Sequence, residues 1–183
     1  MGKTNDRRSL RTKKALKAAM LEQLRGKDIA KITVSELSEL ADIGRGTFYL
    51  HFTDPYDLLD KLENEILEEI TAHTSTLMDA YTNENLLTHL ESIWQNIYEN
   101  MGTLEVLLNR RNGGRFMEKI KRYCVNSTFD NAQGKFHSAQ ESYGVIYIIS
   151  GTLGIFQEWM EQGAPIPPNQ LAQIVRNLIT GPP

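Results

Sequence analysis

At 183 residues, the chain is long enough for one sizeable core, or for a small head on a larger body. Its net charge of -3 and pI near 5.8 argue against a surface that is uniformly basic for nucleic-acid binding. Residues 1–31, however, hold ten Lys and Arg against three Asp and Glu, so this segment has a net charge of +7 and the rest of the chain has -10. This asymmetry indicates either an N-terminal part that binds a polyanion or a basic helix face that is simply solvated.

The first predicted helix runs from about Ser9 to Arg25, and Gly26 ends it. Its apolar face has helical spacing and comprises Leu16, Ala19, Met20 and Leu24. The next helix begins with a capping box, in which the Thr33 hydroxyl accepts from the amide of Glu36 and Glu36 reaches back. This second helix is expected to end near Leu40.

A turn at residues 41–43 leads into a second short helix, predicted from Gly44 to about Leu50. Asp54 and Pro55 then mark another start, because an acidic N-cap is followed by proline at the first helical position. The helix that follows them is expected to extend to about Ala80.

The remaining chain also has helical patterns throughout. Helices are predicted at about 83–101, 103–109, 115–131, 138–162 and 169–180, with a second capping box at Ser138 and Glu141. No segment has the alternation of a strand, and no repeat is evident. The sequence therefore predicts an all-α protein of about nine helices.

Two short helices joined by a tight turn form a helix-turn-helix, whose second helix lies in the DNA major groove. On this helix Phe48 faces the body. Arg45 then points outward as the expected base reader, since its planar fork matches the two acceptors of guanine. Gly46 keeps side-chain bulk off the DNA, while Thr47, Tyr49 and His51 have the reach for phosphates. Thr33 directs a helix N-terminus toward the backbone, and Arg11 and Lys13 add basic contacts.

The stretch "ITVSELSELADIGRGTFYLHFTDPYDLL", residues 32–59, strongly resembles the DNA-binding head of the TetR family of bacterial repressors. Together with the preceding helix, the resemblance covers about residues 9–62. A shorter match, "GTLGIFQEWMEQG" at 151–163, looks like a C-terminal domain common in low-GC Gram-positive members. The resemblance implies a homodimer whose heads bind a palindromic operator and whose C-terminal body senses an effector.

Three residues depart from the family pattern. Asp42 stands where glycine is usual in the turn, and Gly44 replaces the usual serine N-cap. Pro55 occupies a position where many members have a phosphate-contacting lysine, so Lys61 or the basic segment 7–14 is expected to supply part of that contact. That segment either enters the adjacent minor groove or is disordered; both interpretations stay open.

The resemblance divides the chain into a head at 1–53, with an arm at 1–8, and an effector-binding and dimerisation domain at 54–183. It implies a cytoplasmic regulator, expected to be a repressor that an effector releases from double-stranded DNA. The alternative is an activator, or an interaction module, whose body binds a partner protein.

A small-molecule site in the body would have apolar walls with a few polar groups. Most aromatic residues at helical spacing belong to the core, but some can line such a site. The residues expected to line it are Trp94, Tyr98, Phe116, Ile120, Tyr123 and Tyr147.

Three glycines fall on one narrow stripe of the long helix 138–162, and glycine costs about 1 kcal/mol in a helix interior. Either another chain approaches closely there or the stripe packs within one chain. We expect the last two helices to form a four-helix dimer interface. The residues expected to form it are Gly144, Gly151, Gly154, Leu171, Ile174, Val175 and Leu178.

Other classes of function find little support. Cys124 is the one cysteine, so no intramolecular disulfide forms, and the longest apolar stretch is shorter than the ~20 residues that span a bilayer. The sequence contains no phosphate-binding loop, nucleophile motif or metal-ligand spacing. We therefore expect no enzyme activity, no metal, no cofactor and no membrane partner.

Overall fold

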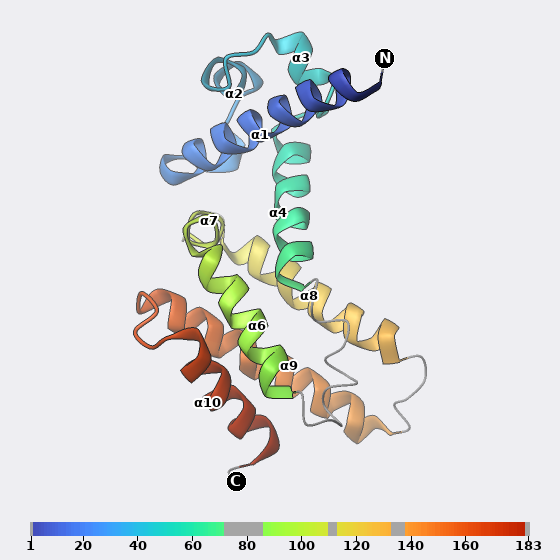
Figure 1. The fold of residues 1–183 in the computed structure, drawn as a ribbon, viewed down its shortest axis with the longest axis vertical. Coiled ribbons are helices and arrows are strands. Elements are labelled where there is room, and N and C mark those ends of the chain that lie inside the picture. Colours follow the sequence, from blue (N-terminus) through green and yellow to red (C-terminus); the bar gives the residue numbers. More distant parts are fainter. Residues whose placement is uncertain (1, 72–85, 110–112, 133–137, 182–183) are drawn as a thin grey trace. The chain divides into compact units, whose positions relative to one another are not determined.

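The computed structural model describes residues 2–71, 86–109, 113–132 and 138–181, and Figure 1 shows their helices. No described residue lies in a strand, so the expected all-α class is confirmed. The helices are α1 (Gly2–Gly26), α2 (Val34–Leu40), α3 (Arg45–Tyr49), α4 (Pro55–Thr71), α6 (Leu86–Glu99), α7 (Met101–Leu107), α8 (Gly113–Ala132), α9 (Ala139–Glu161) and α10 (Pro168–Thr180), with a 3₁₀ turn at Ile29–Lys31.

The chain forms two compact units, and the division falls within α4 rather than at its start. The first unit comprises Met1–Ile66 and Glu105–Phe116. The second comprises Leu67–Leu104 and Met117–Pro183. Three helices, α4, α7 and α8, therefore begin in one unit and continue into the other.

The core of the first unit is formed by the inward faces of its helices. The residues that the sequence placed on the inner face of the first helix are all buried: Leu16, Ala19, Met20 and Leu24. α1 packs against α2 and α2 packs against α3, while Leu37 and Phe48 are fully buried between them. This packing holds the short helix α3, which has too few residues to be stable alone.

The predicted starts of the helix-turn-helix are confirmed in detail. Thr33 Oγ1 accepts from the amide of Glu36, and Glu36 Oε2 accepts from the amide of Thr33, which completes the capping box. The turn after α2 passes through Asp42 at φ 53°, the left-handed conformation in which glycine is usual. Gly44 is the N-cap of α3 and makes no side-chain hydrogen bond.

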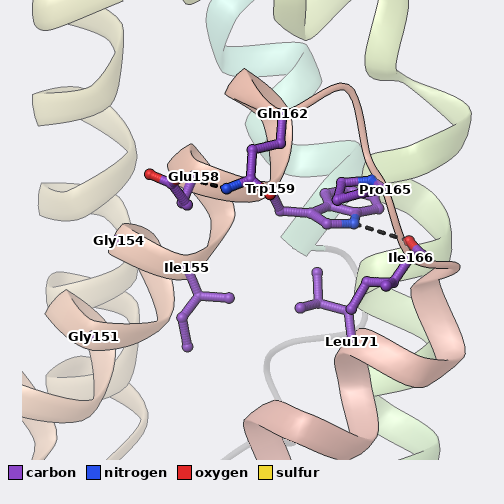
Figure 2. Close-up of a pocket in the computed structure, with 9 residues that line it drawn as sticks. All are labelled: Gly151, Gly154, Ile155, Glu158, Trp159, Gln162, Pro165, Ile166 and Leu171. Carbon is purple, nitrogen blue, oxygen red and sulfur yellow. Dashed lines mark hydrogen bonds between the residues drawn. The ribbon is translucent and has the colours of Figure 1, made fainter.

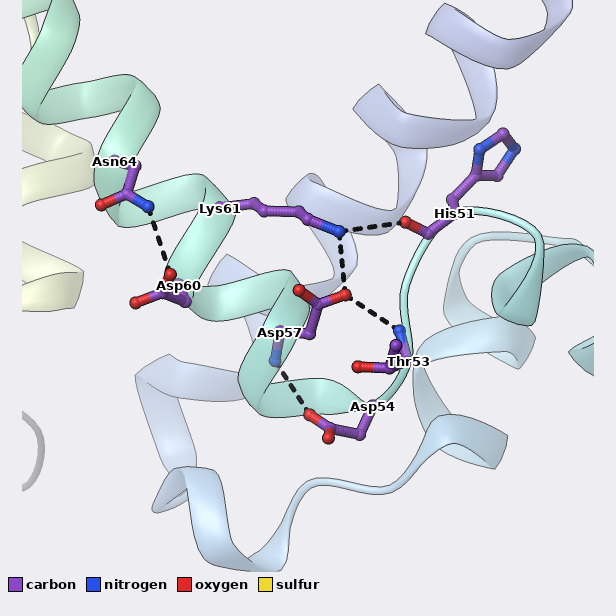
Figure 3. A network of polar contacts seen from close by, with 7 residues as sticks. All are labelled: His51, Thr53, Asp54, Asp57, Asp60, Lys61 and Asn64. Carbon is purple, nitrogen blue, oxygen red and sulfur yellow. Dashed lines mark hydrogen bonds and ion pairs between the residues drawn. The ribbon is translucent and has the colours of Figure 1, made fainter.

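A network of polar contacts fixes the turn between α3 and α4 (Figure 3). Asp54 accepts from the amide of Asp57 at 2.8 Å, as the predicted N-cap should, and Pro55 is the first helical residue. Asp57 in turn accepts from the amide of Thr53 at 2.9 Å and from Lys61 Nζ at 2.9 Å. These bonds hold the backbone at the point where the chain leaves α3.

Two side-chain contacts attach residues 105–116 to the rest of the first unit. Asn109 Nδ2 donates to the backbone oxygen of Leu24, at the end of α1, at 3.0 Å. Arg115 Nη2 lies 3.3 Å from a carboxylate oxygen of Glu63, which is 3% exposed. Residues 105–116 thus belong with the first unit although they are far from it in the sequence.

In the second unit, α10 packs against α6, with Leu171 and Val175 buried. The loop between α9 and α10 turns through Gly163 at φ 72° and Ala164 at φ 53°. Trp159 Nε1 donates to the backbone oxygen of Ile166 at 2.9 Å, which fastens that loop to α9.

Most predicted helix limits agree with the structure to within a few residues. α1 is the main exception, because it begins at Gly2 rather than near Ser9. Residues 72–85 lie outside the described residues, and with them the predicted end of one helix near Ala80 and the predicted start of the next near Asn83.

Candidate nucleic-acid interface

The helix α3 separates one buried side chain from a polar outer face. Phe48 is completely buried, and its ring meets that of Tyr49 edge-on at 5.6 Å between centroids. Tyr49 is nevertheless 60% exposed, and Arg45 and Gly46 are also exposed. A Cβ on Gly46 would meet no atom within 4 Å, so the chain itself gives no packing reason for glycine there.

Arg45 is not free to rotate, although it is exposed. Its Nη2 donates to Ser35 Oγ of α2 at 2.6 Å. Arg45 makes no ion pair among the described residues. Its charge is therefore directed by a neutral acceptor and not neutralised by a carboxylate.

Three other residues predicted to face the DNA backbone, Thr47, His51 and Thr33, differ in exposure and in hydrogen bonding. Thr47 is half-buried on α3. His51 is also half-buried, and its imidazole points away from the polar network beneath it (Figure 3). The Thr33 hydroxyl donates to Glu36 Oε2 at 2.9 Å, so in the unbound chain its proton is already used within the capping box.

Lys61, expected to replace the missing lysine at position 55, is engaged by its own turn. Its Nζ contacts Asp57 at 2.9 Å and the backbone oxygen of His51 at 3.4 Å, and lies 5.1 Å from the centroid of the Phe52 ring. The Lys61 hydrogen bond is the largest cause of the lowered pKa of Asp57, ahead of the bond from the Thr53 amide. Lys61 therefore stabilises the turn and would have to break these bonds to reach a phosphate.

Cations on α1 supply exposed positive charge instead. The basic residues that the structure describes there as exposed, with no ion pair, are Arg7, Arg8, Arg11, Lys13 and Lys14. The backbone is helical throughout this stretch, so it is neither an extended arm nor without structure. Lys17 and Lys27, nearer the body of the unit, instead pair with Glu65 and Glu36.

The carboxyl group of Glu36 has a strongly lowered pKa. The side-chain hydrogen bond from Lys27, at 2.6 Å, and the bonds from Thr33 lower the pKa of Glu36 from 4.5 to about 2. Because these partners favour the ionised carboxylate, the capping box stays intact at neutral pH.

The six residues expected to line a ligand pocket are divided between the two units. Trp94 is 1% exposed, and its ring centroid lies 5.7 Å from that of Trp159, which also contacts Tyr98 at 6.2 Å. Tyr147 is 78% exposed. The other three all lie on α8: Phe116 is buried in the first unit, whereas Ile120 and Tyr123 belong to the second.

A shallow hollow of about 530 Å³, open to solvent, lies between the end of α9, the following loop and the start of α10 (Figure 2). Its walls are mainly apolar, with Ile155, Trp159 and Leu171 among them. Gly151 and Gly154 from the predicted dimer surface form one side. This hollow was not predicted from the sequence, nor was it predicted that Trp159 lines it and binds the following loop. Gly163 and Pro165, which follow α9, do indicate the loop that forms one of its sides.

The glycine stripe on α9 is open to the outside. Within the described part of the chain, a Cβ on Gly144, Gly151 or Gly154 would meet no atom within 4 Å, so no described helix packs closely on this stripe. On α10 the expected interface residues divide: Leu171 and Val175 are buried in their own chain, whereas Ile174 and Leu178 are 41% and 68% exposed.

Neither a membrane span nor a metal cluster is found in the described part of the chain. None of its helices is long and apolar enough to cross a bilayer. It contains no group of three His, Cys, Asp or Glu side chains that would hold a metal ion. Burial raises the pKa of the Cys124 thiol to about 11, which makes it a poor nucleophile.

Comparison with protein families gives a match over residues 84–181, more than half of the chain, to the family described as "Transcriptional regulator C-terminal region". A relative from Bacillus subtilis (strain 168), described as the uncharacterized HTH-type transcriptional regulator YxbF, is 27% identical over 171 residues. The alignment covers 92% of this chain but only 44% of that protein, so the chain spans less than half of its relative's length.

Solved structures share the fold over nearly the whole chain. A TetR transcriptional regulator from Streptococcus agalactiae 2603V is 18% identical, with a TM-score of 0.69 and coverage of 98% of this chain and 99% of that one. The dihydroxyacetone kinase operon activator DhaS is also 18% identical, with a TM-score of 0.59 and coverage of 92% and 93%. At these identities the likeness establishes the architecture and not the ligand.

Proposed function

The chain belongs to the TetR family of transcriptional regulators, which are not enzymes, and we propose that it binds a palindromic DNA operator through α3. The observation that carries the proposal is the outward face of α3. There an arginine without an ion pair and an exposed tyrosine flank a glycine with open space over it, while Phe48 anchors the helix from behind.

This face suits the DNA major groove by its chemistry. Arg45 has the planar donor fork that matches guanine, and Gly46 lets the backbone approach the groove closely. Tyr49 and the exposed cations of α1 would hold the phosphates, which position a protein without specifying a sequence. The net charge of -3 does not oppose this, because the positive charge is gathered in residues 1–31.

We propose further that two copies associate through the outer faces of α9 and α10. Gly151 and Gly154 are open to another helix, and Ile174 and Leu178 present exposed apolar groups on α10. A two-fold dimer would present two copies of α3 to half-sites one helical turn apart. Leu171 and Val175 would support this surface from within, since they are buried under it.

An effector held by the second unit would change DNA affinity by changing the spacing of the two heads. The three helices that pass from one unit into the other give a continuous covalent path for such a change. Thermodynamic linkage then requires the operator to alter effector affinity by the same factor. The fold does not fix the sign of regulation, since one structural neighbour is described as an operon activator.

The test begins with selection of duplexes from random DNA, followed by affinity measurements at one fixed salt concentration. Arg45→Ala should weaken binding to the selected duplex by about 1–3 kcal/mol and relax preference at one position in each half-site. Tyr49→Phe should weaken binding to all duplexes alike. Binding and preference that both survive Arg45→Ala would reject α3 as the reading helix.

A further inference from the structure

We propose that Ser35 is a positioning residue that aims Arg45 before DNA arrives and thereby sets the base preference of the regulator. The proposal rests on the proposed function, because it concerns the same interface. It adds a residue on α2, outside the reading helix, to the groups that determine specificity.

In this contact the short Ser35 side chain is the acceptor and the long Arg45 side chain is the donor. Arg45 Nη2 donates to Ser35 Oγ at 2.6 Å, across the turn that joins α2 to α3. Ser35 lies in the first turn of α2, between Thr33 and Glu36 of the capping box, and Leu37 and Ser38 of the same helix are buried. The acceptor is therefore held by a well-packed element, whereas Arg45 is exposed.

The bond leaves the reading capacity of Arg45 intact. A guanidinium has five N–H donors, and Ser35 accepts one of them. The remaining donors include two that can pair with the O6 and N7 acceptors of guanine. The Ser35 hydroxyl accepts in this bond, so its own proton remains for DNA or solvent.

The choice of a hydroxyl as partner distinguishes Arg45 from other cations of the first unit. Lys17, Lys27 and Lys61 each pair with a carboxylate. A carboxylate on Arg45 would cancel its charge and would repel the phosphates of DNA. A serine directs the side chain and keeps the positive charge available.

Fixing the side chain in advance lowers the cost of binding. An unrestrained arginine loses rotamer entropy when it docks, and that loss reduces affinity for the correct base. Preorganisation should therefore help the sequence-specific complex, in which Arg45 must meet a base edge at a defined angle. It should matter little to nonspecific binding, which depends on charge alone.

The experiment is a double-mutant cycle on the full chain, with Ser35→Ala, Arg45→Ala and the double variant. Each is titrated with the duplex selected by the wild-type chain, with that duplex changed at the position read by Arg45, and with an unrelated duplex. Ser35→Ala should lower affinity for the selected duplex roughly 3- to 10-fold and reduce discrimination at that position by a similar factor. In the Arg45→Ala background the same change should have little further effect. Ser35→Thr, which keeps the hydroxyl, should restore much of the preference.

Two readouts exclude other roles for Ser35. If the serine acted mainly on a phosphate, Ser35→Ala would weaken binding to all three duplexes equally and by the same factor with or without Arg45; that result would overturn the proposal. An unchanged discrimination ratio would overturn it as well. Failure of the proposed function looks different, because Arg45→Ala itself would then have no effect on binding. The melting temperature should be unchanged by Ser35→Ala, since alanine is a good helix former.

Discussion

The helices α3 and α9 each combine an exposed tyrosine with glycine on one face, although they lie far apart in the sequence. Each carries an exposed tyrosine next to glycine: Tyr49 beside Gly46 on α3, and Tyr147 between Gly144 and Gly151 on α9. At all of these glycines a Cβ would meet no atom within 4 Å. Glycine weakens a helix, and no described atom lies close to these positions, so both faces leave room for the partners proposed above, DNA at α3 and a second copy of the chain at α9.

The two faces differ in charge and length, and this difference supports the different partners that we propose for them. α3 has five residues, begins with Arg45 and lies in a unit whose N-terminal helix carries exposed cations. α9 has 23 residues, and its stripe of Tyr147, Gly151 and Gly154 has no charged side chain. A short basic face suits a DNA groove, whereas a long uncharged face suits a second protein helix.

The largest effect is expected from filling the α9 face. The double substitution Gly151→Leu, Gly154→Leu should break the dimer and lower operator affinity about 100-fold or more, because the two half-sites would no longer be bound together. Each leucine should also stabilise the isolated chain by several tenths of a kcal/mol, since it replaces an exposed helical glycine. Analytical ultracentrifugation and thermal unfolding would measure both.

A matched control for the α9 variants is Gly102→Leu in α7, where a helical glycine also has open space around it. It should keep the dimer and the operator affinity. A dimer that persists after both α9 glycines are filled would place the interface on another surface.

A smaller effect is expected from filling the α3 face. Gly46→Leu should weaken binding to every duplex about 10-fold or more, because the added side chain holds the backbone away from the groove. Thermal stability should not fall, since the position has room for the side chain. If affinity is unchanged, close backbone approach at Gly46 does not occur, and the parallel between α3 and α9 fails.

Acid should affect the first unit through Glu36. The folded pKa of about 2 lies below the ordinary 4.5, so the ionised carboxylate stabilises the folded state above pH 4.5. That contribution should be lost as pH falls from 4.5 toward 2. Glu36→Gln should flatten the fall in melting temperature over this range, and Lys27→Met should flatten it in part, because Lys27 is the main cause of the shift. An unaltered acid slope in both variants would assign the acid sensitivity to other carboxylates.

The smallest effects are expected at two turns, one in each unit. Asp42 and Ala164 both have φ 53°, which costs free energy for a residue with a Cβ. Ala164→Gly should raise stability by about 0.5–1 kcal/mol, and Asp42→Gly by less, because aspartate tolerates this conformation better than alanine does. Denaturant unfolding would measure both changes. A larger gain at Asp42 than at Ala164 would reverse this ranking.

The head could be predicted almost completely from the sequence because local signals fix it. The Thr33 capping box, the Asp54–Pro55 start and the spacing from Leu16 to Leu24 each act within a few residues, and all three are present in the structure. The outward position of Arg45 follows from the same helical periodicity once Phe48 is placed inward.

The body could be predicted only as a set of helices. Periodicity says which residues share a face, but not which other helix covers that face. Helical periodicity therefore did not specify that the Trp94 ring packs against that of Trp159, or that Tyr147 is exposed. Trp94 Nε1 is buried and has no hydrogen-bond partner among the described residues, which no local pattern would indicate.

What the sequence determined by itself is the secondary structure, the helix-turn-helix and the polarity of α3, because capping, turn conformation and helical period are properties of neighbouring residues. What only the tertiary structure decided are contacts between residues distant in the chain. Ser35 meets Arg45 across a turn, and Asn109 reaches Leu24 across 85 positions. Among the described residues, no atom lies within 4 Å of a Cβ placed on the α9 glycines, and that depends on how distant helices pack.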